Sequence, residues 1–547
     1  MSKQSERLLV QLSEIRAETI EEADEAVPGR AGKRPTWRRW AAMAAGLAIV
    51  LFTAGVLTGV IPLLGGNTSN EGVNPSGSGP TTFMSYAGPV FPLTLREADS
   101  AITAERSITL DFTPWMPVWR SNEEEADREG YTPEQRQETL DMYNDWYPEG
   151  GRWLSSTDIL VTDTYTLTNT TEEEKTVSVL YPFSGALYEL AKCTPTLRLD
   201  KAELDATLHA GGYSGGFQDA YGSSGERRLN LNQLNSWEEY KALLSDGRYQ
   251  RLALGEYPDL SGVPVTVYRF FDYYGPEPDE KAGYPNPSIR AGFELDYDRT
   301  AVLTYGFHAA SYDREHGTMI QGFSIPMPFD PRYGDFYYLI VVGDDIRNLA
   351  TGAYVTGGTD ADTKKLDNAG VSVERYTSDL ETALRMAAEL IYGRRERLQE
   401  SKTDFEMYFG LFKEFLCSYG VLSEEPAERY VTGWLEDLEV DAVDRVFYLE
   451  AEVTIPAGGS VRLTAEMRKH GSYDFYCAHT ENQGVYGYDL VTELGSNLTC
   501  TVQRATIEDR GVIEIVRQNF GFDLKNGVKT VDLDPAQEHY YLEVSRR

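Results

Sequence analysis

Histidine and cysteine are scarce in this sequence. Its 547 residues include six His and four Cys. None of the His forms an H-E-x-x-H, an H-x-x-x-H or a Cys/His pair with the spacing of metal ligands. His470, Cys477 and His479 lie near one another, but they make an incomplete ligand set, and a strand and turn are expected there. The sequence therefore predicts no metal site and no cofactor.

Basic residues are also few relative to acids, with 51 Lys and Arg against 86 Asp and Glu. Residues 1–39 hold eight of these bases and seven of the acids, and residues 40–64 hold none. The rest keeps 43 bases and 79 acids, a net charge of −36. A surface this acidic repels the phosphate backbone of nucleic acids. We therefore expect no nucleic-acid binding by the part of the chain after residue 64. The charge either keeps an exported surface soluble or attracts cations or a basic partner.

The uncharged residues 40–64 read WAAMAAGLAIVLFTAGVLTGVIPLL. About 20 apolar residues span a bilayer, so this run predicts a transmembrane helix. Five bases precede it and no other Lys or Arg follows before Arg96, which by the positive-inside rule places the N-terminus in the cytoplasm. A cleaved signal peptide usually has an apolar region of about 7–15 residues behind a short leader. The long leader and long run favour an uncleaved signal-anchor in a single-pass cell-membrane protein with an extracytoplasmic C-terminal part.

Residues 5–26 have the pattern of an amphipathic helix ending at Pro28 and Gly29. Leu8, Leu12 and Ile15 share one stripe, and charges fill the opposite face. A helix too short to form its own core is only marginally stable unless it docks on a partner. The pattern leaves partner binding and simple tethering equally open.

The opening of the chain resembles a known arrangement of parts. It reads RLLVQLSEIRAETIEEADEA and then KRPTWRRWAAMAAGLAIVL. This opening is similar to the start of uncharacterised Gram-positive bacterial membrane proteins, and its order of parts resembles that of transmembrane anti-sigma factors. The resemblance covers about the first 60 residues. It implies a cytoplasmic segment that holds a regulator such as a sigma factor, and an outer domain that senses the envelope.

Beyond a Gly/Ser/Asn/Pro-rich linker at 65–82, strand patterns dominate. Residues 159–168 and 176–181 alternate around a polar loop, and residues 446–455 and 461–467 alternate around a Pro-Ala-Gly-Gly turn, so two hairpins are expected. Nine further strands are expected at 265–271, 293–297, 301–307, 319–325, 336–342, 486–491, 498–507, 513–517 and 540–544. The predicted fold is mainly β with a helical insertion and β-sandwich-like ectodomain units.

Two segments have helical patterns. Residues 132–146 begin with Thr132 and Pro133 and place Gln135 at the capping-box position. In the larger block at 378–438, Ser378 and Glu381 are expected to open a helix. The expected order is an N-terminal β-rich region at 83–372, a helical block at 373–440 and a C-terminal sandwich-like domain at 441–547.

The search for catalytic and ion-binding motifs yields weak candidates. Residues 212–216 match G-x-S-x-G around Ser214, but glycines flank the Ser and no helix pattern follows, so a Gly-rich loop is the better interpretation. Asp360 and Asp362 suggest a calcium loop, yet Lys365 and Val371 occupy the positions that need Gly and Glu. A polar surface turn is expected instead.

Several aromatic, cysteine and asparagine residues are further candidates. Tyr and Trp clusters can stack on sugars, although packing roles come first. Of the four Cys, Cys477 and Cys500 make the most plausible disulfide, and Cys417 is expected to be a buried thiol. Three Asn stand in the N-x-[ST] context, which matters only in a cell that glycosylates them. They are Asn67, Asn169 and Asn497.

These patterns favour a non-enzymatic surface protein whose ectodomain binds or senses an extracellular ligand, with signalling through residues 5–26. A structural or adhesive envelope protein that uses the N-terminus only as an anchor is the second class. An envelope hydrolase is the third, and it would require Ser214.

Overall fold

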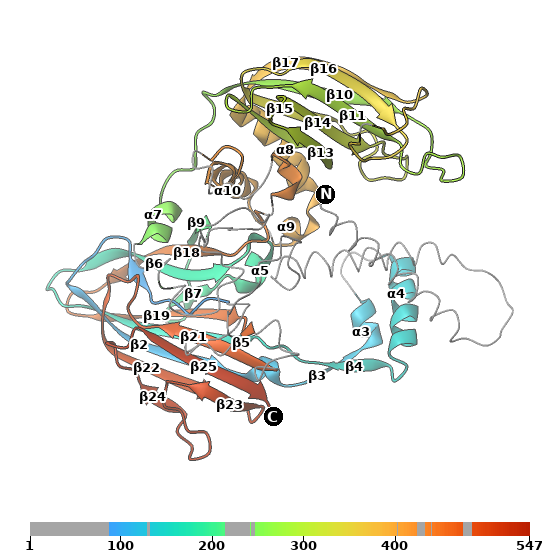
Figure 1. The fold of residues 1–547 in the computed structure, drawn as a ribbon. Helices are drawn as coiled ribbons and strands as arrows, with labels where there is room; N and C mark the ends of the chain where they lie inside the picture. Colours follow the sequence, from blue (N-terminus) through green and yellow to red (C-terminus); the bar gives the residue numbers. More distant parts are fainter. Residues whose placement is uncertain are drawn as a thin grey trace. The chain divides into compact units, whose positions relative to one another are not determined.

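The computed structural model describes residues 87–127, 132–213, 241, 247–360, 362–401, 403–418, 420–423, 433–438, 440–473 and 484–547. All of them belong to one compact unit, Asn74–Gln218 and Arg228–Arg547. The expected transmembrane, amphipathic and linker segments at 40–64, 5–26 and 65–82 lie outside these residues. Among the described residues, no helix is long and apolar enough to cross a membrane. This part of the chain is mainly β, with several antiparallel sheets and a few helices, as predicted (Figure 1).

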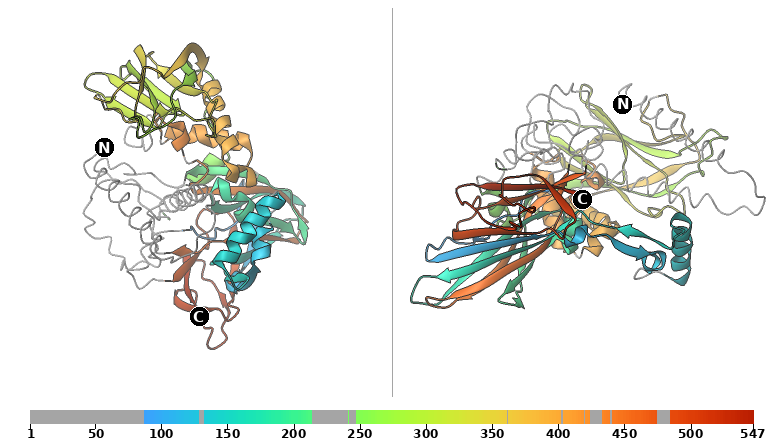
Figure 2. Two further views of the ribbon diagram at one scale, coloured as in Figure 1. Left: turned by 90° about the vertical axis from the view of Figure 1, so that its right-hand side faces the viewer. Right: turned by 90° about the horizontal axis from the view of Figure 1, so that it is seen from below.

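A seven-stranded sheet is the largest. Its order is β24-β22-β2-β5-β19-β7-β8, and β2 and β22 are parallel neighbours. Its strands are β2 (Ile102–Asp111), β5 (Ile159–Asn169), β7 (Thr196–Leu199), β8 (Ala202–Glu203), β19 (Ser460–Lys469), β22 (Thr499–Glu508) and β24 (Thr530–Asp532). In Figure 2 the blue, teal and orange strands of this sheet run side by side, although they come from distant parts of the sequence.

A second sheet has the order β1-β6-β18-β9. Its strands are β1 (Thr94–Leu95), β6 (Lys175–Gly185), β9 (Thr207–Tyr213) and β18 (Arg445–Ile455). Apolar residues of both sheets, such as Leu167 and Val453, belong to the same buried core. The two sheets join strands from both sides of the helical block, so these pairings cross the boundaries expected at residues 373 and 441.

The two expected hairpins are wrong as pairings, although all four strands form. β5 pairs with β19 and β6 pairs with β18, each in antiparallel register. Each turn therefore carries the chain from one sheet to the other, and the two turns lie against each other. The period-two pattern fixes which residues face the core, but it does not identify the partner strand.

Two four-stranded sheets, β12-β15-β10-β17 and β13-β14-β11-β16, enclose a separate core. Their strands are β10 (Pro264–Tyr274), β11 (Ser288–Glu294), β12 (Thr300–Tyr305), β13 (Ala309–Asp313), β14 (Thr318–Ser324), β15 (Tyr337–Gly343), β16 (Arg347–Tyr354) and β17 (Gly370–Asp379). Phe270 and Leu339 from the first sheet meet Ile289 and Phe323 from the second. The opposite face of the first sheet, including Val267, shares the larger core with the helices.

The helical block contains α8 (Leu380–Arg394), α9 (Glu396–Glu400) and α10 (Phe405–Ser418). The expected cap is off by one residue, because the carboxylate of Asp379, rather than Ser378, accepts a hydrogen bond from the Thr382 amide. Leu384 on α8 and Phe412 on α10 are buried in the larger core. Periodic apolar faces thus dock both helices onto the sheets.

The last four-stranded sheet lies near the C-terminus and has the order β20-β21-β25-β23. Its strands are β20 (Ser472–Tyr473), β21 (Val485–Val491), β23 (Ile513–Gln518) and β25 (His539–Arg546). The nine further strands predicted from the pattern are confirmed in this and the preceding sheets, except that β11 covers Ser288–Glu294 rather than 293–297. β23 lies at the edge of its sheet, and this position creates the site described below.

The remaining elements lie outside the sheets described above. The β3–β4 ribbon carries two helices between its strands. These elements are η1 (Thr113–Trp115), β3 (Val118–Ser121), α3 (Asn122–Ala126), α4 (Pro133–Trp146) and β4 (Gly151–Leu154). The predicted helix 132–146 is confirmed with its capping box between Thr132 and Gln135. The others are η2 (Leu187–Glu189), α5 (Leu190–Cys193), α7 (Arg248–Ala253) and η5 (Leu435–Asp437).

Candidate ligand groove

A groove of about 510 Å³ runs along the edge strand β23. Its lining comes from β23, the loop that follows it, β25 and the last residue of the chain. The lining residues are Glu514, Ile515, Val516, Arg517, Gln518, Phe522, Asp523, Leu524, Lys525, Tyr541 and Arg547. We call this the β23 groove. Its volume lies in the range of small-molecule sites, about 300–1,000 Å³.

The loop after β23 forms one wall of the groove, and local hydrogen bonds fix it. The Gln518 side-chain amide donates to the Phe522 carbonyl at 2.6 Å, and the Phe522 amide donates back to Gln518 Oε1 at 3.0 Å. The Asp523 carboxylate accepts hydrogen bonds from the backbone and side chain of Asn526. Gly527, with φ +77°, closes this tight turn, a conformation that favours glycine. The wall is therefore preformed.

Arg517 connects the groove to a buried acid. Its Nε donates to the carboxylate of Glu543, which is 0% exposed, while the Arg517 side chain stays partly in solvent. Register explains the contact, because Arg517 on β23 lies directly opposite Glu543 on β25. Burial raises the pKa of Glu543 to about 7, with Asp489 adding repulsion and Arg517 acting in the opposite direction. Glu543 Oε1 is buried and has no hydrogen-bond partner in the described part of the chain.

The lining combines charge with apolar surface. Arg517, Lys525 and Arg547 supply three cations, Glu514 and Asp523 supply two carboxylates, and Ile515 and Leu524 supply apolar side chains. Arg binds carboxylate and phosphate groups well because its planar donors match their geometry. The lining holds no Ser, Cys or His side chain. The Arg and Lys side chains and the apolar surface beside them are groups that can contact an anionic ligand with an apolar part.

Several residues singled out from the sequence lie outside the described residues. They are Leu8, Leu12, Ile15, Ser214 and Cys477. Their roles stay predictions.

Of the cysteines considered from the sequence, Cys417 and Cys500 lie within the described residues. Cys500 is buried on β22, and because its expected partner lies outside the described residues, the disulfide stays a prediction. Cys417 was expected to be a buried thiol, and it lies half-buried on α10. Burial raises the pKa of the Cys417 thiol, which makes it a weak nucleophile.

His470 and Asp360, which the sequence suggested as candidate ion ligands, contact protein groups instead. His470 Nδ1 lies 2.7 Å from Asp158 Oδ1, and this contact raises the pKa of His470. The Asp360 carbonyl accepts hydrogen bonds from Arg290 and Thr363 in the surface segment between β16 and β17. Within the described residues, no group of three or more His, Cys, Asp or Glu side chains could hold a metal ion.

Asn169 is a structural residue rather than an accessible glycosylation acceptor. It is 0% exposed, and its hydrogen bonds place its side chain between the turns that follow β5 and β18. The amide donates to the Glu173 carbonyl at 2.7 Å and to the carbonyls of Ile455 and Pro456 at 3.3 Å. Its Oδ1 accepts from the Thr171 backbone and hydroxyl. The side-chain amide to which a glycan would be attached is thus already engaged in hydrogen bonds within the fold.

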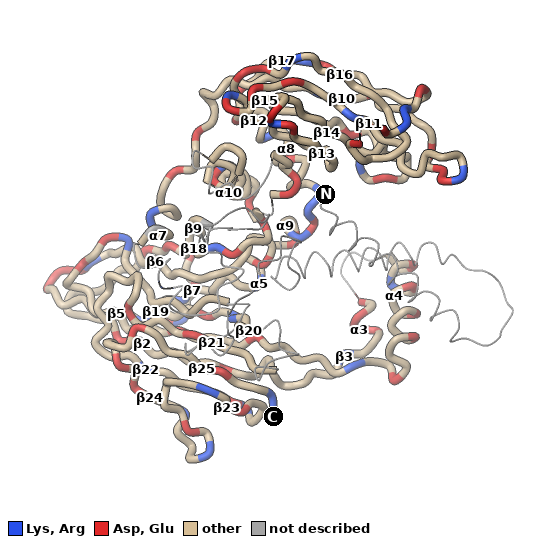
Figure 3. The backbone as a smooth tube through the Cα atoms, viewed as in Figure 1, with Lys and Arg blue, Asp and Glu red and all other residues tan. Residues whose placement is uncertain are grey.

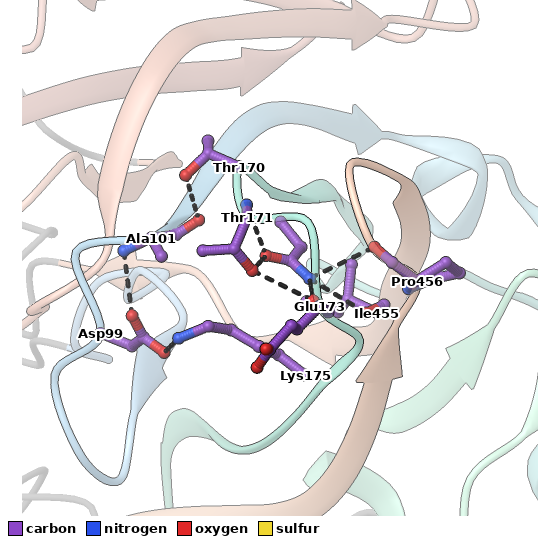
Figure 4. A network of polar contacts seen from close by, with 9 residues as sticks. Asp99, Ala101, Thr170, Thr171, Glu173, Lys175, Ile455 and Pro456 are labelled. Atoms are coloured by element: carbon purple, nitrogen blue, oxygen red, sulfur yellow. Dashed lines mark hydrogen bonds and ion pairs between the residues drawn. The ribbon is translucent and has the colours of Figure 1, made fainter.

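Next to this amide, two further contacts fasten the turn after β5. The Asp99 carboxylate accepts from Lys175 Nζ at 2.5 Å and from the Ala101 amide at 2.9 Å. Thr170 donates from its backbone amide and its hydroxyl to the Ala101 carbonyl. The segment just before β2 is thereby tied to the turn after β5, as Figure 4 shows.

The aromatic clusters divide between core and surface. Tyr268 and Phe270 are buried between the two sheets of the smaller core, and Trp115 is buried in the larger one. Trp119, Trp146 and Trp153 are exposed, at 39%, 56% and 67%. The expectation that most of these aromatics pack in the core or in cross-strand pairs is confirmed for the buried ones and for Trp119 and Trp153, which are cross-strand partners. The exposed Trp residues are considered further below.

Sequence reasoning missed both Arg517 and Glu543. The only local signal is that Glu543 belongs to the apolar strand pattern YYLEV, in which alternation places it on the opposite face of the strand from Tyr540 and Leu542. Alternation predicts a solvent-facing acid there. Its burial depends on neighbouring segments that the pattern does not specify.

No protein-family model, curated protein or solved structure matches this chain.

Proposed function

We propose that this chain is a membrane-anchored cell-surface protein whose β-rich extracytoplasmic part binds a small anionic ligand in the β23 groove. The observation that carries the binding role is the Arg517–Glu543 pair, which places a cation in a preformed groove above a buried acid. Clefts of this size with a few converging polar groups are the usual form of ligand sites.

The membrane anchor is supported by the uncharged run 40–64, the bases before it and the acidic remainder of the chain. The proposal also treats the extracytoplasmic part as β-sandwich-like units, supported by the pair of four-stranded sheets that enclose one core. A non-enzymatic role is favoured because the described lining of the groove contains no Ser, Cys or His side chain that a neighbouring base could activate.

The groove is tested with small probes on the full-length chain in detergent. We expect hexanoate, benzoate and hexyl phosphate at millimolar concentration to raise the thermal midpoint, while hexanamide and benzamide leave it unchanged. The effect should disappear in Arg517→Met and persist in Arg504→Met, a control Arg that is exposed and paired with Asp532. An equal response to charged and neutral probes, or an unchanged response in Arg517→Met, would exclude the groove as an anion site.

Signalling to the cytoplasm is the second part of the proposal. The stripe of Leu8, Leu12 and Ile15 is the surface proposed to bind a regulator such as a sigma factor. Capture from native cytosol with residues 1–39 as bait tests it. A regulator that the wild-type bait retains and the Leu12→Ser bait loses supports signalling. If the wild-type bait retains nothing specific, residues 1–39 act as an anchor only, and the adhesive or structural alternative gains ground.

A further inference from the structure

The ribbon of β3 and β4 with its two helices forms a separate surface module, residues 113–154, which we call the tryptophan arm. Among the described strands, β3 and β4 pair only with each other. An isolated two-stranded ribbon is marginally stable in water. α3 and α4, which connect the two strands, supply the missing packing (Figure 1).

The polar side chains inside the arm are used to hold its own parts together. Asn122 on α3 donates to Asn144 Oδ1 and to the Tyr147 carbonyl, both at 2.9 Å. Arg152 on β4 stacks on Tyr147 with its guanidinium carbon 4.8 Å from the ring centre. It also donates to the Tyr147 hydroxyl at 2.6 Å. These contacts hold together the described parts of the arm, 113–127 and 132–154.

Large apolar side chains nevertheless point into solvent from the arm. Trp119 and Trp153 face each other across the ribbon, with ring centres 5.5 Å apart in an edge-to-face arrangement. Trp153 and Trp146 are more than half exposed, and so is Val118. Exposed Trp residues on a rigid support are the typical anchors of protein interfaces.

The charge of the arm selects the kind of partner. Residues 113–154 contain ten acids and four bases, a net charge of −6. Acidic positions mark both α3 and α4 in Figure 3. Two of the bases are already engaged, Arg136 with Asp127 at 2.7 Å and Arg152 with Glu125 at 3.6 Å. This charge repels anionic lipid and nucleic acid, and it attracts Lys and Arg side chains, which also stack favourably on Trp.

We propose that the tryptophan arm is a docking surface for a basic protein segment that carries apolar side chains. Trp119, Trp146 and Trp153 supply the apolar and cation–π contacts, and the acids of α3 and α4 supply charge complementarity. This site is independent of the β23 groove, which comprises other residues of the chain.

The test measures binding of a fluorescein-labelled peptide of alternating Arg and Leu to the full-length chain in detergent. Trp146→Ser/Trp153→Ser should weaken binding by about tenfold or more, because two interface anchors are lost without a change in charge. The aromatic control Tyr274→Ser/Phe329→Ser removes two exposed rings elsewhere and should leave binding unchanged.

A matched pair of charge variants separates local from overall attraction. Glu134→Gln/Glu138→Gln/Asp145→Asn neutralises three exposed acids of the arm, and Glu172→Gln/Glu173→Gln/Glu174→Gln neutralises three exposed acids outside it. Only the first should weaken binding. Equal weakening by both sets would show that the peptide responds to net charge alone and would overturn the proposal.

The remaining outcomes identify other occupants. Chitin oligosaccharides that bind the wild type and not Trp146→Ser/Trp153→Ser, together with unchanged peptide binding, would assign the arm to glycans. Binding to phosphatidylcholine vesicles with the same dependence on Trp would assign it to a membrane surface. Either result replaces the basic protein partner. Circular dichroism and the thermal midpoint of each variant confirm that the fold is kept.

Discussion

Arg517 on the edge strand β23 donates a hydrogen bond to Glu543, a carboxylate that is completely buried on β25. The ion pair joins a solvent-exposed groove to the interior of the C-terminal sheet. A group placed in this way links ligand charge to protonation inside the protein, since an anion at Arg517 competes with Glu543 for the same guanidinium.

The pH dependence of stability should reveal Glu543. Its pKa is about 7 in the folded chain, raised by burial above an ordinary value of 4.5. A carboxyl with a raised pKa stabilises the fold while it is protonated, so this contribution is present below pH 4.5 and lost as the pH rises to about 7. Wild type should therefore lose at most about 3 kcal/mol relative to Glu543→Gln across this window. Urea unfolding of both chains at pH 4.5 and pH 7.5 measures it, and parallel pH profiles would contradict it.

Asn169 should be essential for the interlocked turns. Asn169→Ala removes a buried amide and leaves the carbonyls of Glu173, Ile455 and Pro456 without this hydrogen-bond donor. We expect a loss of about 2–3 kcal/mol in the free energy of unfolding. Asn286→Ala changes an exposed Asn and should stay within about 0.5 kcal/mol of wild type. In a glycosylating host, intact-protein mass spectrometry should find no glycan at Asn169; a glycan there on the folded chain contradicts its burial.

The pair Arg106–Asp163 is completely buried in the largest core. Arg106 also donates to the carbonyls of Phe91 and Val491, and the hydroxyls of Tyr165 and Tyr181 donate to Asp163. Breaking a buried pair leaves an uncompensated charge, so Asp163→Ala should cost about 3–5 kcal/mol.

The exposed pair Arg504–Asp532 is the control for this prediction. Asp532→Ala should change stability by less than about 1 kcal/mol, because solvent screens both charges. Denaturant midpoints of the two variants decide the matter, and similar losses would refute the special role of the buried pair.

Gly151 should be irreplaceable in the tryptophan arm. A Cβ at this position would lie 2.8 Å from the Trp119 ring and closer still to the Arg120 carbonyl. Gly151→Ala must therefore displace the ribbon and separate Trp119 from Trp153. We expect a shift in Trp fluorescence and a loss of about 1–3 kcal/mol. Gly262→Ala meets open space and is the matched control. An unchanged emission spectrum in Gly151→Ala would show that the Trp pair does not depend on this close approach.

Local patterns were enough for most individual elements. The capping box of Thr132 and Gln135 located the start of α4, because its hydrogen bonds lie within four residues. Alternation located β18 and β19, because one face of each is buried. The same alternation gave the wrong partners, since a strand pattern specifies a face and leaves the neighbour open.

The β23 groove could not be read from the sequence. Arg517 and Glu543 are 26 positions apart, and only the register between β23 and β25 brings them together. The burial of Glu543, which raises its pKa, comes from packing by other segments. Likewise, the four Trp residues between 115 and 153 gave no sign that Trp115 alone would be buried.

The sequence by itself determined the properties that depend on local composition: the uncharged run at 40–64, the excess of acids, the strands and the amphipathic helices. Tertiary structure alone decided which strands share a sheet, that Asn169 is buried between two turns, and that Arg517 reaches Glu543. The reason is physical. Periodicity and charge are encoded in neighbouring residues, whereas pairing, burial and pKa depend on groups that the chain brings together across hundreds of positions.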